Sequence, residues 1–182
     1  MGHFAAPDGQ AYEQHGKGRS RRPNVLWLFG DQHRHHAQGF AGDPNLHTPN
    51  IDDLARFGVT WAQGAISGYP LCCPFRGSLL SGRWPHRCVP VHEAPFPDGM
   101  PTIAQPFNDA GYHTAWFGKW HVDGCRERDG RAAFWIVPPE RRGGFQTWEG
   151  YENNNSQFDC WVHGGAGSDA YLEKLEGFET DA

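Results

Sequence analysis

Two adjacent cysteines begin the segment of this sequence that is richest in chemically useful residues. Cys72 and Cys73 are followed by Arg76, and an apolar stretch then ends at Gly82. We predict a helix over residues 75–81, which places the two thiols at a helix start. Free N–H groups and the positive end of the helix dipole favour an anion there. Arg76, one turn later, presents a rigid fork of donors suited to oxyanions.

A second candidate site follows the first apolar run of the chain. Residues 25–29 predict a strand buried on both faces, and Asp31 and Gln32 come directly after it. In α/β sheets, ligands bind beyond the carboxyl ends of the strands. Carboxylate and amide oxygens suit a hard cation. We therefore expect Asp31 and Gln32 to be metal ligands.

Lys119 and His121 follow a predicted strand over residues 113–117. Side chains two positions apart in an extended segment lie on the same side. Both can therefore face a single anion, with His121 as a general acid or as a hydrogen-bond donor.

The elements that must position these residues alternate between strand and helix. Thr48 as N-cap, Pro49 at the first helical position and Gly58 as a stop predict a helix. We predict a further helix over 102–110 and a short strand over 59–61. This alternation indicates an α/β fold.

The later part of the sequence gives weaker predictions. Residues 125–170 show no clear periodicity, and we expect long surface loops in which Arg126, Arg141 and Arg142 are surface charges. Residues 1–22 contain several glycines and a basic cluster but no apolar core of a secretory signal. We expect a disordered leader there, with the cytoplasm as the default compartment.

Composition excludes several classes of protein. The 182 residues are enough for one domain, and the formal charge of −5 argues against a nucleic-acid partner. No apolar run approaches the roughly 20 residues that span a membrane, so no membrane association is expected. The five cysteines are an odd, irregularly spaced set without a CxxC pair, which argues against a disulfide framework and against a structural zinc site.

The segment from Cys72 to Arg83 resembles the sulfatase signature C-x-P-x-R-x-x-x-L-(T/S)-G-(R/K) at every fixed position. Only Cys72 has proline two and arginine four residues later, so the resemblance selects Cys72 over Cys73. The pair Asp31-Gln32 and the segments 48–52 and 118–121 resemble further blocks of that family, in the same order. The resemblance implies an α/β, alkaline-phosphatase-like sandwich with a mostly parallel central sheet flanked by helices.

The resemblance also implies a reaction. A formylglycine-generating maturase would oxidise Cys72 to formylglycine, an aldehyde that hydrates to a diol. One hydroxyl attacks the sulfur of a carbohydrate or aryl sulfate ester, and the second then loses its proton and expels sulfate. A Ca²⁺ ion held by Asp31, Gln32 and the modified Cys72 would polarise the ester. Arg76 would hold the diol, and Lys119 and His121 would contact the sulfate.

Three functions stay open at this level. The first is sulfate ester hydrolysis. The second is hydrolysis of phosphonate monoesters or phosphodiesters by a relative of the same superfamily, and the third is a non-catalytic remnant. After Asp123 we find no pair resembling the family's later metal ligands. We therefore expect residues 23–182 to be the incomplete N-terminal part of a catalytic domain, inactive alone.

Other residues carry weaker hypotheses. His33 could reach the metal pair, although a solvated loop is the plainer interpretation. A group of aromatic and amide side chains could line a sugar subsite or could pack a loop; its members are Trp148, Tyr151, Asn153, Asn154, Asn155 and Trp161. His163 has no matching motif around it, and no role is assigned to it.

Overall fold

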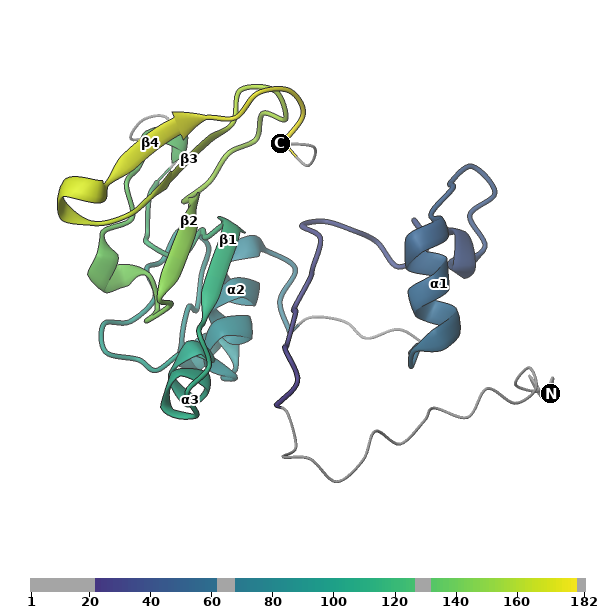
Figure 1. Cartoon of the computed structure of the whole chain (residues 1–182), viewed down its shortest axis with the longest axis horizontal. Coiled ribbons are helices and arrows are strands. Elements are labelled where there is room, and N and C mark those ends of the chain that lie inside the picture. The colour runs from purple at the N-terminus through teal and green to yellow at the C-terminus, as the bar shows by residue number, and fades with distance from the viewer. Residues whose placement is uncertain (1–21, 62–67, 127–131, 180–182) are drawn as a thin grey trace. The chain divides into compact units, whose positions relative to one another are not determined.

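The computed structural model describes residues 22–61, 68–126 and 132–179 (Figure 1). The chain divides into two compact units, Met1–Arg34 and His35–Ala182. The predicted leader falls almost entirely outside the described residues. None of the helices in the described part is long and apolar enough to cross a membrane.

Residues 22–34 of the first unit contain neither helix nor strand. The strand predicted over residues 25–29 is therefore wrong, and Leu26 and Leu28 are 87% and 83% exposed. An apolar run becomes a buried strand only when it pairs with neighbouring strands, and none of the four strands in the described residues pairs with this run.

Helix α1, Pro49–Phe57, confirms the predicted start and end, with Thr48 as N-cap and Gly58 as C-cap. The Thr48 hydroxyl does not cap the helix. It accepts a hydrogen bond from the Gly39 N–H and donates one to Asp52, both at 2.8 Å. Thr48 thereby ties the preceding turn to the helix. Residues 59–61, predicted as a strand, are exposed and irregular.

The described sheet has four strands in the order β1-β2-β3-β4 (Figure 1). They are β1 (Ala115–Lys119), β2 (Thr147–Tyr151), β3 (Trp161–Gly164) and β4 (Tyr171–Lys174). The β1–β2 pair is parallel, and the other two pairs are antiparallel. Gly118 pairs with Gly150, where a Cβ would lie 2.2 Å from the Gly118 carbonyl oxygen. This close approach requires glycine at position 150.

The prediction of surface loops over residues 125–170 is wrong for much of this segment, because it contains β2, β3 and part of the core. Trp148 packs with Trp120, which in turn packs with Trp116, at ring-centroid distances of 6.1 and 5.0 Å. The strands are too short and too rich in glycine to show a period of two, so the sequence pattern did not reveal them.

Two further helices lie, like α1 and the sheet, in the second unit. Helix α2, Cys72–Ser81, begins three residues before the predicted start, and Gly82 ends it in the left-handed region at φ 66°. Helix α3, Ala104–Asp109, is shorter than predicted. A Cβ on Gly77 would lie 2.5 Å from Val89 Cγ2. Glycine at position 77 therefore lets the loop after α2 pack directly on that helix.

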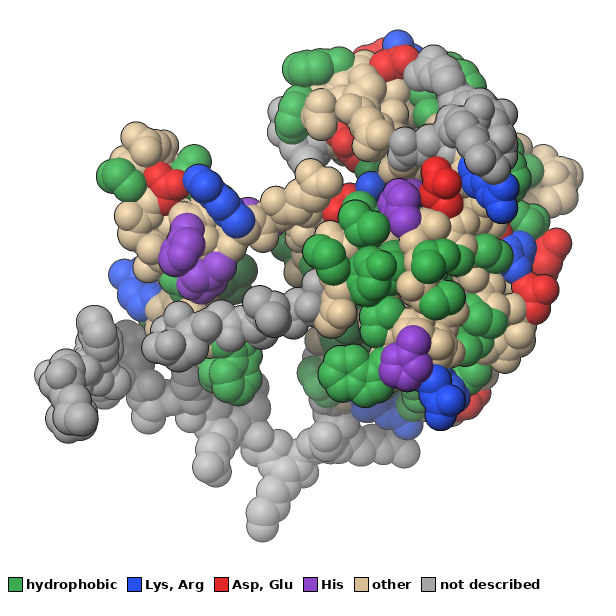
Figure 2. Space-filling model, turned by 180° about the vertical axis from the view of Figure 1, so that it is seen from behind, with side chains coloured by type: hydrophobic (Ala, Val, Ile, Leu, Met, Phe, Trp, Pro, Cys, Tyr) green, Lys and Arg blue, Asp and Glu red, His purple; other side chains and the backbone are tan. Residues whose placement is uncertain are grey.

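Hydrophobic side chains remain visible across the surface of this unit (Figure 2). Trp84 and Phe117, for example, are 70% and 67% exposed.

Candidate active site

The two cysteines at the start of α2 have different environments. Cys72 is the first helical residue and is partly exposed, whereas Cys73 is 1% exposed. Burial raises the pKa of the Cys73 thiol to about 11. Cys72 is therefore the more accessible of the two thiols.

Lys119 lies beside Cys72, and Arg76 follows Cys72 by about one turn of α2. The Lys119 ammonium nitrogen lies 3.7 Å from Cys72 Sγ. Arg76 is 3% exposed, and its guanidinium donates a hydrogen bond to the Lys119 carbonyl oxygen. Helix α2 and the end of β1 are thus joined at the residues that the sequence singled out. The result is a positively charged environment around a helix N-terminus, which suits an oxyanion.

His121 is placed differently from the expectation. Strand β1 ends at Lys119, and His121 adopts φ 54°, so the alternation of an extended segment does not continue to it. Its side chain is 2% exposed and packs edge-on against His92, with ring centroids 5.2 Å apart. A tight turn, and not strand periodicity, sets the direction of His121.

Backbone hydrogen bonds hold this turn from both sides. The Trp120 N–H donates to the Tyr151 carbonyl, and the Phe96 N–H donates to the Val122 carbonyl, each at 2.7 Å. The Glu152 carboxylate accepts the Asp123 N–H at 2.9 Å and the Cys125 N–H at 3.3 Å.

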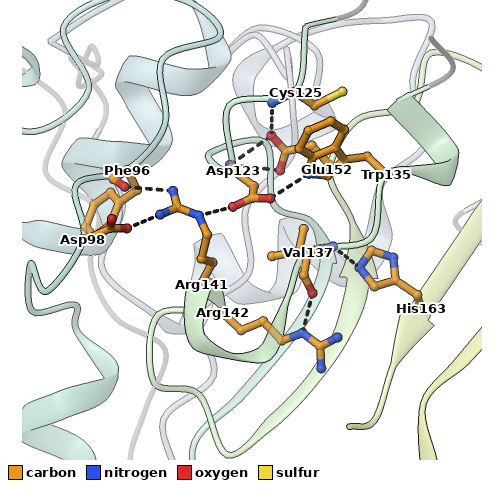
Figure 3. Close-up of polar contacts among 10 residues, drawn as sticks. All are labelled: Phe96, Asp98, Asp123, Cys125, Trp135, Val137, Arg141, Arg142, Glu152 and His163. Atoms are coloured by element: carbon orange, nitrogen blue, oxygen red, sulfur yellow. Dashed lines mark hydrogen bonds and ion pairs between the residues drawn. The ribbon is translucent and has the colours of Figure 1, made fainter. Parts of the chain in front are cut away.

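Glu152 is a fully buried carboxylate (Figure 3). Burial, with a contribution from the nearby Asp123 charge, raises the pKa of Glu152 to about 7. A carboxyl group in this position fixes the backbone that follows His121, because it accepts hydrogen bonds from the backbone N–H groups of residues 123–125.

Arg141 extends the same network, which corrects its assignment as a surface charge (Figure 3). Its guanidinium pairs with Asp123 and Asp98 and donates to the Phe96 carbonyl at 3.0 Å. Trp135 donates to the second Asp123 oxygen at 2.6 Å. The Asp123 carboxylate is therefore paired on both oxygens, and the turn is tied to the loop that carries Phe96.

Arg142 is buried, at 6% exposure, whereas Arg141 is half-buried. It donates to the Val137 carbonyl at 3.0 Å and lies over the Trp148 ring at 4.8 Å. His163 accepts the Val137 N–H at 2.8 Å and is fully buried (Figure 3). Burial and the Arg142 charge lower the pKa of His163 to about 4. His163 is a core hydrogen-bond acceptor, which agrees with its exclusion from the site.

Asp31 and Gln32 lie in the first unit, at an exposed turn where Gln32 has φ 56°. Their oxygen atoms fit a hard divalent cation, and the metal site remains a prediction. His33 is also exposed in that unit.

Burial argues against a sugar-binding role for three of the residues considered for a subsite. Trp148, Tyr151 and Asn153 are 5%, 7% and 2% exposed and pack in the body. Asn154 and Trp161 are half-buried and Asn155 is exposed, so for them the subsite stays a hypothesis.

Sequence reasoning missed two residues near the site, His92 and Glu152. His92 lies 3.3 Å from Cys73 Sγ through its Nδ1 atom. Neither residue belongs to a recognisable motif. Only the tertiary contacts of the loop after α2 and of the end of β2 bring them to the turn.

Comparison with known proteins identifies the family of this chain. The family profile described as Sulfatase matches residues 23–179. The chain is 37% identical to the "Ulvan-active sulfatase" of Formosa agariphila over 153 residues, covering 77% of this chain and 29% of that protein. It is 34% identical to the "Endo-4-O-sulfatase" of Bacteroides thetaiotaomicron, covering 81% of this chain and 34% of the relative.

A solved structure described as the sulfatase yidJ from Bacteroides fragilis superposes with a TM-score of 0.69 at 26% identity, covering 81% of this chain and 35% of that one. The chain belongs to the sulfatase family and has the corresponding alkaline-phosphatase-like α/β fold in part. It spans about a third of the length of the relatives that it matches.

Proposed function

We propose that this chain carries the nucleophile and part of the sulfate site of a sulfuric ester hydrolase, with Cys72 converted to formylglycine. The observation that supports this most directly is the position of Cys72 at the first turn of α2, with the Lys119 ammonium 3.7 Å from its sulfur. The family membership and the names of the relatives support the choice of a sulfate ester.

Each proposed site residue has a separate task. The first turn of α2 presents N–H groups to the oxyanion, and Lys119 places a cation beside the reacting atom. Arg76, anchored on the Lys119 carbonyl, keeps α2 and β1 in register. His121, whose backbone is held by the turn, protonates the leaving alcohol or holds a sulfate oxygen.

Two groups complete this proposal. Formylglycine, when hydrated, supplies one hydroxyl that attacks sulfur and a second whose deprotonation expels sulfate. A divalent cation such as Ca²⁺ would polarise the ester, and Asp31 and Gln32 are the residues proposed to hold it. Both donor residues of the first unit offer oxygen atoms at an exposed turn, which suits such an ion.

The test begins with the modification itself. We would co-express the chain with a formylglycine-generating enzyme and measure the mass of the peptide that contains Cys72. Conversion of the thiol to an aldehyde lowers the mass by about 18 Da, since SH and H give way to a carbonyl oxygen. The variant Cys73→Ala should keep this loss and Cys72→Ala should abolish it. A plain thiol at Cys72, with a control sulfatase converted in the same cells, would favour the non-catalytic alternative.

The substrate class needs a second measurement. The segment would be joined to the C-terminal two thirds of a relative, and hydrolysis of an aryl sulfate and of a phosphonate monoester would be compared. Faster turnover of the sulfate ester supports the proposal. Faster turnover of the phosphonate assigns the chain to the phosphonate hydrolases of the same superfamily.

A further inference from the structure

Three metal-binding side chains from three separate segments converge beneath the candidate active site. Cys73 comes from the first turn of α2, His92 from the loop before α3, and His121 from the turn after β1. One donor atom of each lies within 4.8 Å of those of the other two. The closest pair is Cys73 Sγ and His92 Nδ1, at 3.3 Å.

The spacing of these atoms suits a tetrahedral metal ion. With Zn–S near 2.3 Å and Zn–N near 2.0–2.1 Å, two donors on one Zn²⁺ ion lie about 3.3–3.6 Å apart. The Cys73–His92 distance of 3.3 Å lies in this range, and the His121 donor atom lies within 4.8 Å of both.

The surroundings hold these donors in place. Cys73 and His121 are 1% and 2% exposed, and His92 is the most accessible of the three. The Glu93 N–H donates to Cys73 Sγ at 3.3 Å, in a loop fixed on α2 by the close contact of Gly77 with Val89. Outer hydrogen bonds of this kind orient metal ligands.

We propose that Cys73, His92 and His121 form a binding site for Zn²⁺ or a similar borderline transition-metal ion, with a fourth position open to water. A thiolate and two imidazoles favour such an ion over Ca²⁺, which prefers oxygen donors. On binding, the Cys73 thiol releases one proton and its sulfur bonds to the metal. The site is distinct from the cation site predicted at Asp31 and Gln32.

The proposal stands on the three side chains alone and not on the proposed function. It has a consequence for that function, because His121 belongs to both sites. An ion on the imidazole of His121 removes this side chain from the sulfate, so occupancy should inhibit hydrolysis. The sequence has no CxxC pair, and on that ground it argued against a structural zinc site. The three ligands lie in separate segments, so no local motif marks them.

The test uses Co²⁺ as a spectroscopic probe of the full chain. We expect one equivalent to produce a sulfur-to-cobalt charge-transfer band and the visible bands of a tetrahedral ion, both removed by Zn²⁺. Cys73→Ser should abolish the charge-transfer band. His92→Gln should weaken Co²⁺ binding on the order of tenfold or more.

Two matched variants separate this site from its neighbours. Cys72→Ala should keep the charge-transfer band, which excludes the adjacent thiol as the sulfur donor. His113→Gln replaces an exposed histidine bonded to Thr147 at 2.8 Å, and it should bind Co²⁺ as the unaltered chain does. A band that survives Cys73→Ser, or binding unaffected by His92→Gln, would overturn the proposal.

A measurement on the unaltered chain covers the case in which a variant fails to fold. One equivalent of Zn²⁺ should raise the thermal midpoint of the unaltered chain, because an ion that binds the folded state stabilises it. An unchanged midpoint would overturn the proposal. If the chain bound Co²⁺ but Cys72 were not converted to formylglycine, the proposed function would be refuted and the metal site would stand. The failure of either proposal can therefore be told from the failure of the other.

Discussion

The Lys119 ammonium nitrogen lies 3.7 Å from Cys72 Sγ, although the two residues are 47 positions apart in the sequence. The contact exists because the end of β1 meets the first turn of α2, where Arg76 donates to the Lys119 carbonyl. A cation and a nucleophile position are thus held together by backbone elements and not by flexible loops.

Replacing Lys119 with methionine should impair catalysis without unfolding the body. Loss of one preorganised charge near the reacting atom should lower kcat of the formylglycine form by about 10²–10³-fold. The measurement is aryl sulfate hydrolysis by the extended protein described above. Lys174→Met removes an exposed lysine that pairs with Asp159 at 3.3 Å, and turnover should be unchanged. Equal losses in both variants would contradict a specific role for Lys119.

Arg76→Met should destabilise the fold. The change leaves the Lys119 carbonyl without the Arg76 donor, and we expect the free energy of unfolding to fall by about 1–3 kcal/mol in urea titrations. Arg56→Met is the control, because Arg56 forms an exposed pair with Asp53 at 2.5 Å. Such pairs contribute about 0–1 kcal/mol. If Arg76→Met were no more destabilising than this control, the α2–β1 link would not be structurally important.

Glu152 should give the stability of the protein a measurable pH dependence. Its pKa rises from 4.5 to about 7 on folding. Between these pH values the folded state retains a proton that the unfolded state has released, so the Glu152 contribution is full below pH 4.5 and is lost as the pH rises through 7. The difference in unfolding free energy between the unaltered chain and Glu152→Gln should shrink by about 3 kcal/mol from pH 4.5 to 8.

His163 should act with the opposite sign and serves as the matched comparison. Its pKa falls from 6.5 to about 4 on folding, so its contribution is full above pH 6.5 and is lost as the pH falls through 4. Urea unfolding of His163→Gln should therefore differ from the unaltered chain increasingly as the pH rises from 4 to 7. If the unfolding free energies of both variants changed with pH in the same way as that of the unaltered chain, the pKa shifts assigned to Glu152 and His163 would be refuted.

Gly77→Ala should disturb the packing beneath the site. The added Cβ would lie 2.5 Å from Val89 Cγ2, and overpacking of this kind costs about 1–3 kcal/mol. The thermal midpoint should fall, and Co²⁺ binding at the Cys73 cluster should weaken because Val89 belongs to the loop that carries His92. Ser78→Ala, one residue later in α2, should leave both unchanged. A thermal midpoint unaffected by Gly77→Ala would show that the loop carrying Val89 can shift to accept the added Cβ, and would contradict the close packing proposed here.

Local chemistry in the sequence was sufficient for several parts of this result. Thr48, Pro49 and Gly58 predicted the ends of α1, because helix boundaries depend on residues close to them. The choice of Cys72 over Cys73 followed from residue spacing, and it agrees with the partial exposure of Cys72 and the burial of Cys73. The family was also evident from the motif, since its fixed positions lie within one helix and its flanks.

Tertiary structure decided the features that depend on distant partners. A strand needs neighbours, so the apolar run over residues 25–29 gave a wrong prediction while β2 and β3 went unrecognised. Arg141 and Arg142 were predicted at the surface because burial of a charge is set by its partners, here Asp123 and the Val137 carbonyl. The placement of His92 beside Cys73 follows only from packing of the loop after α2, which no local pattern encodes.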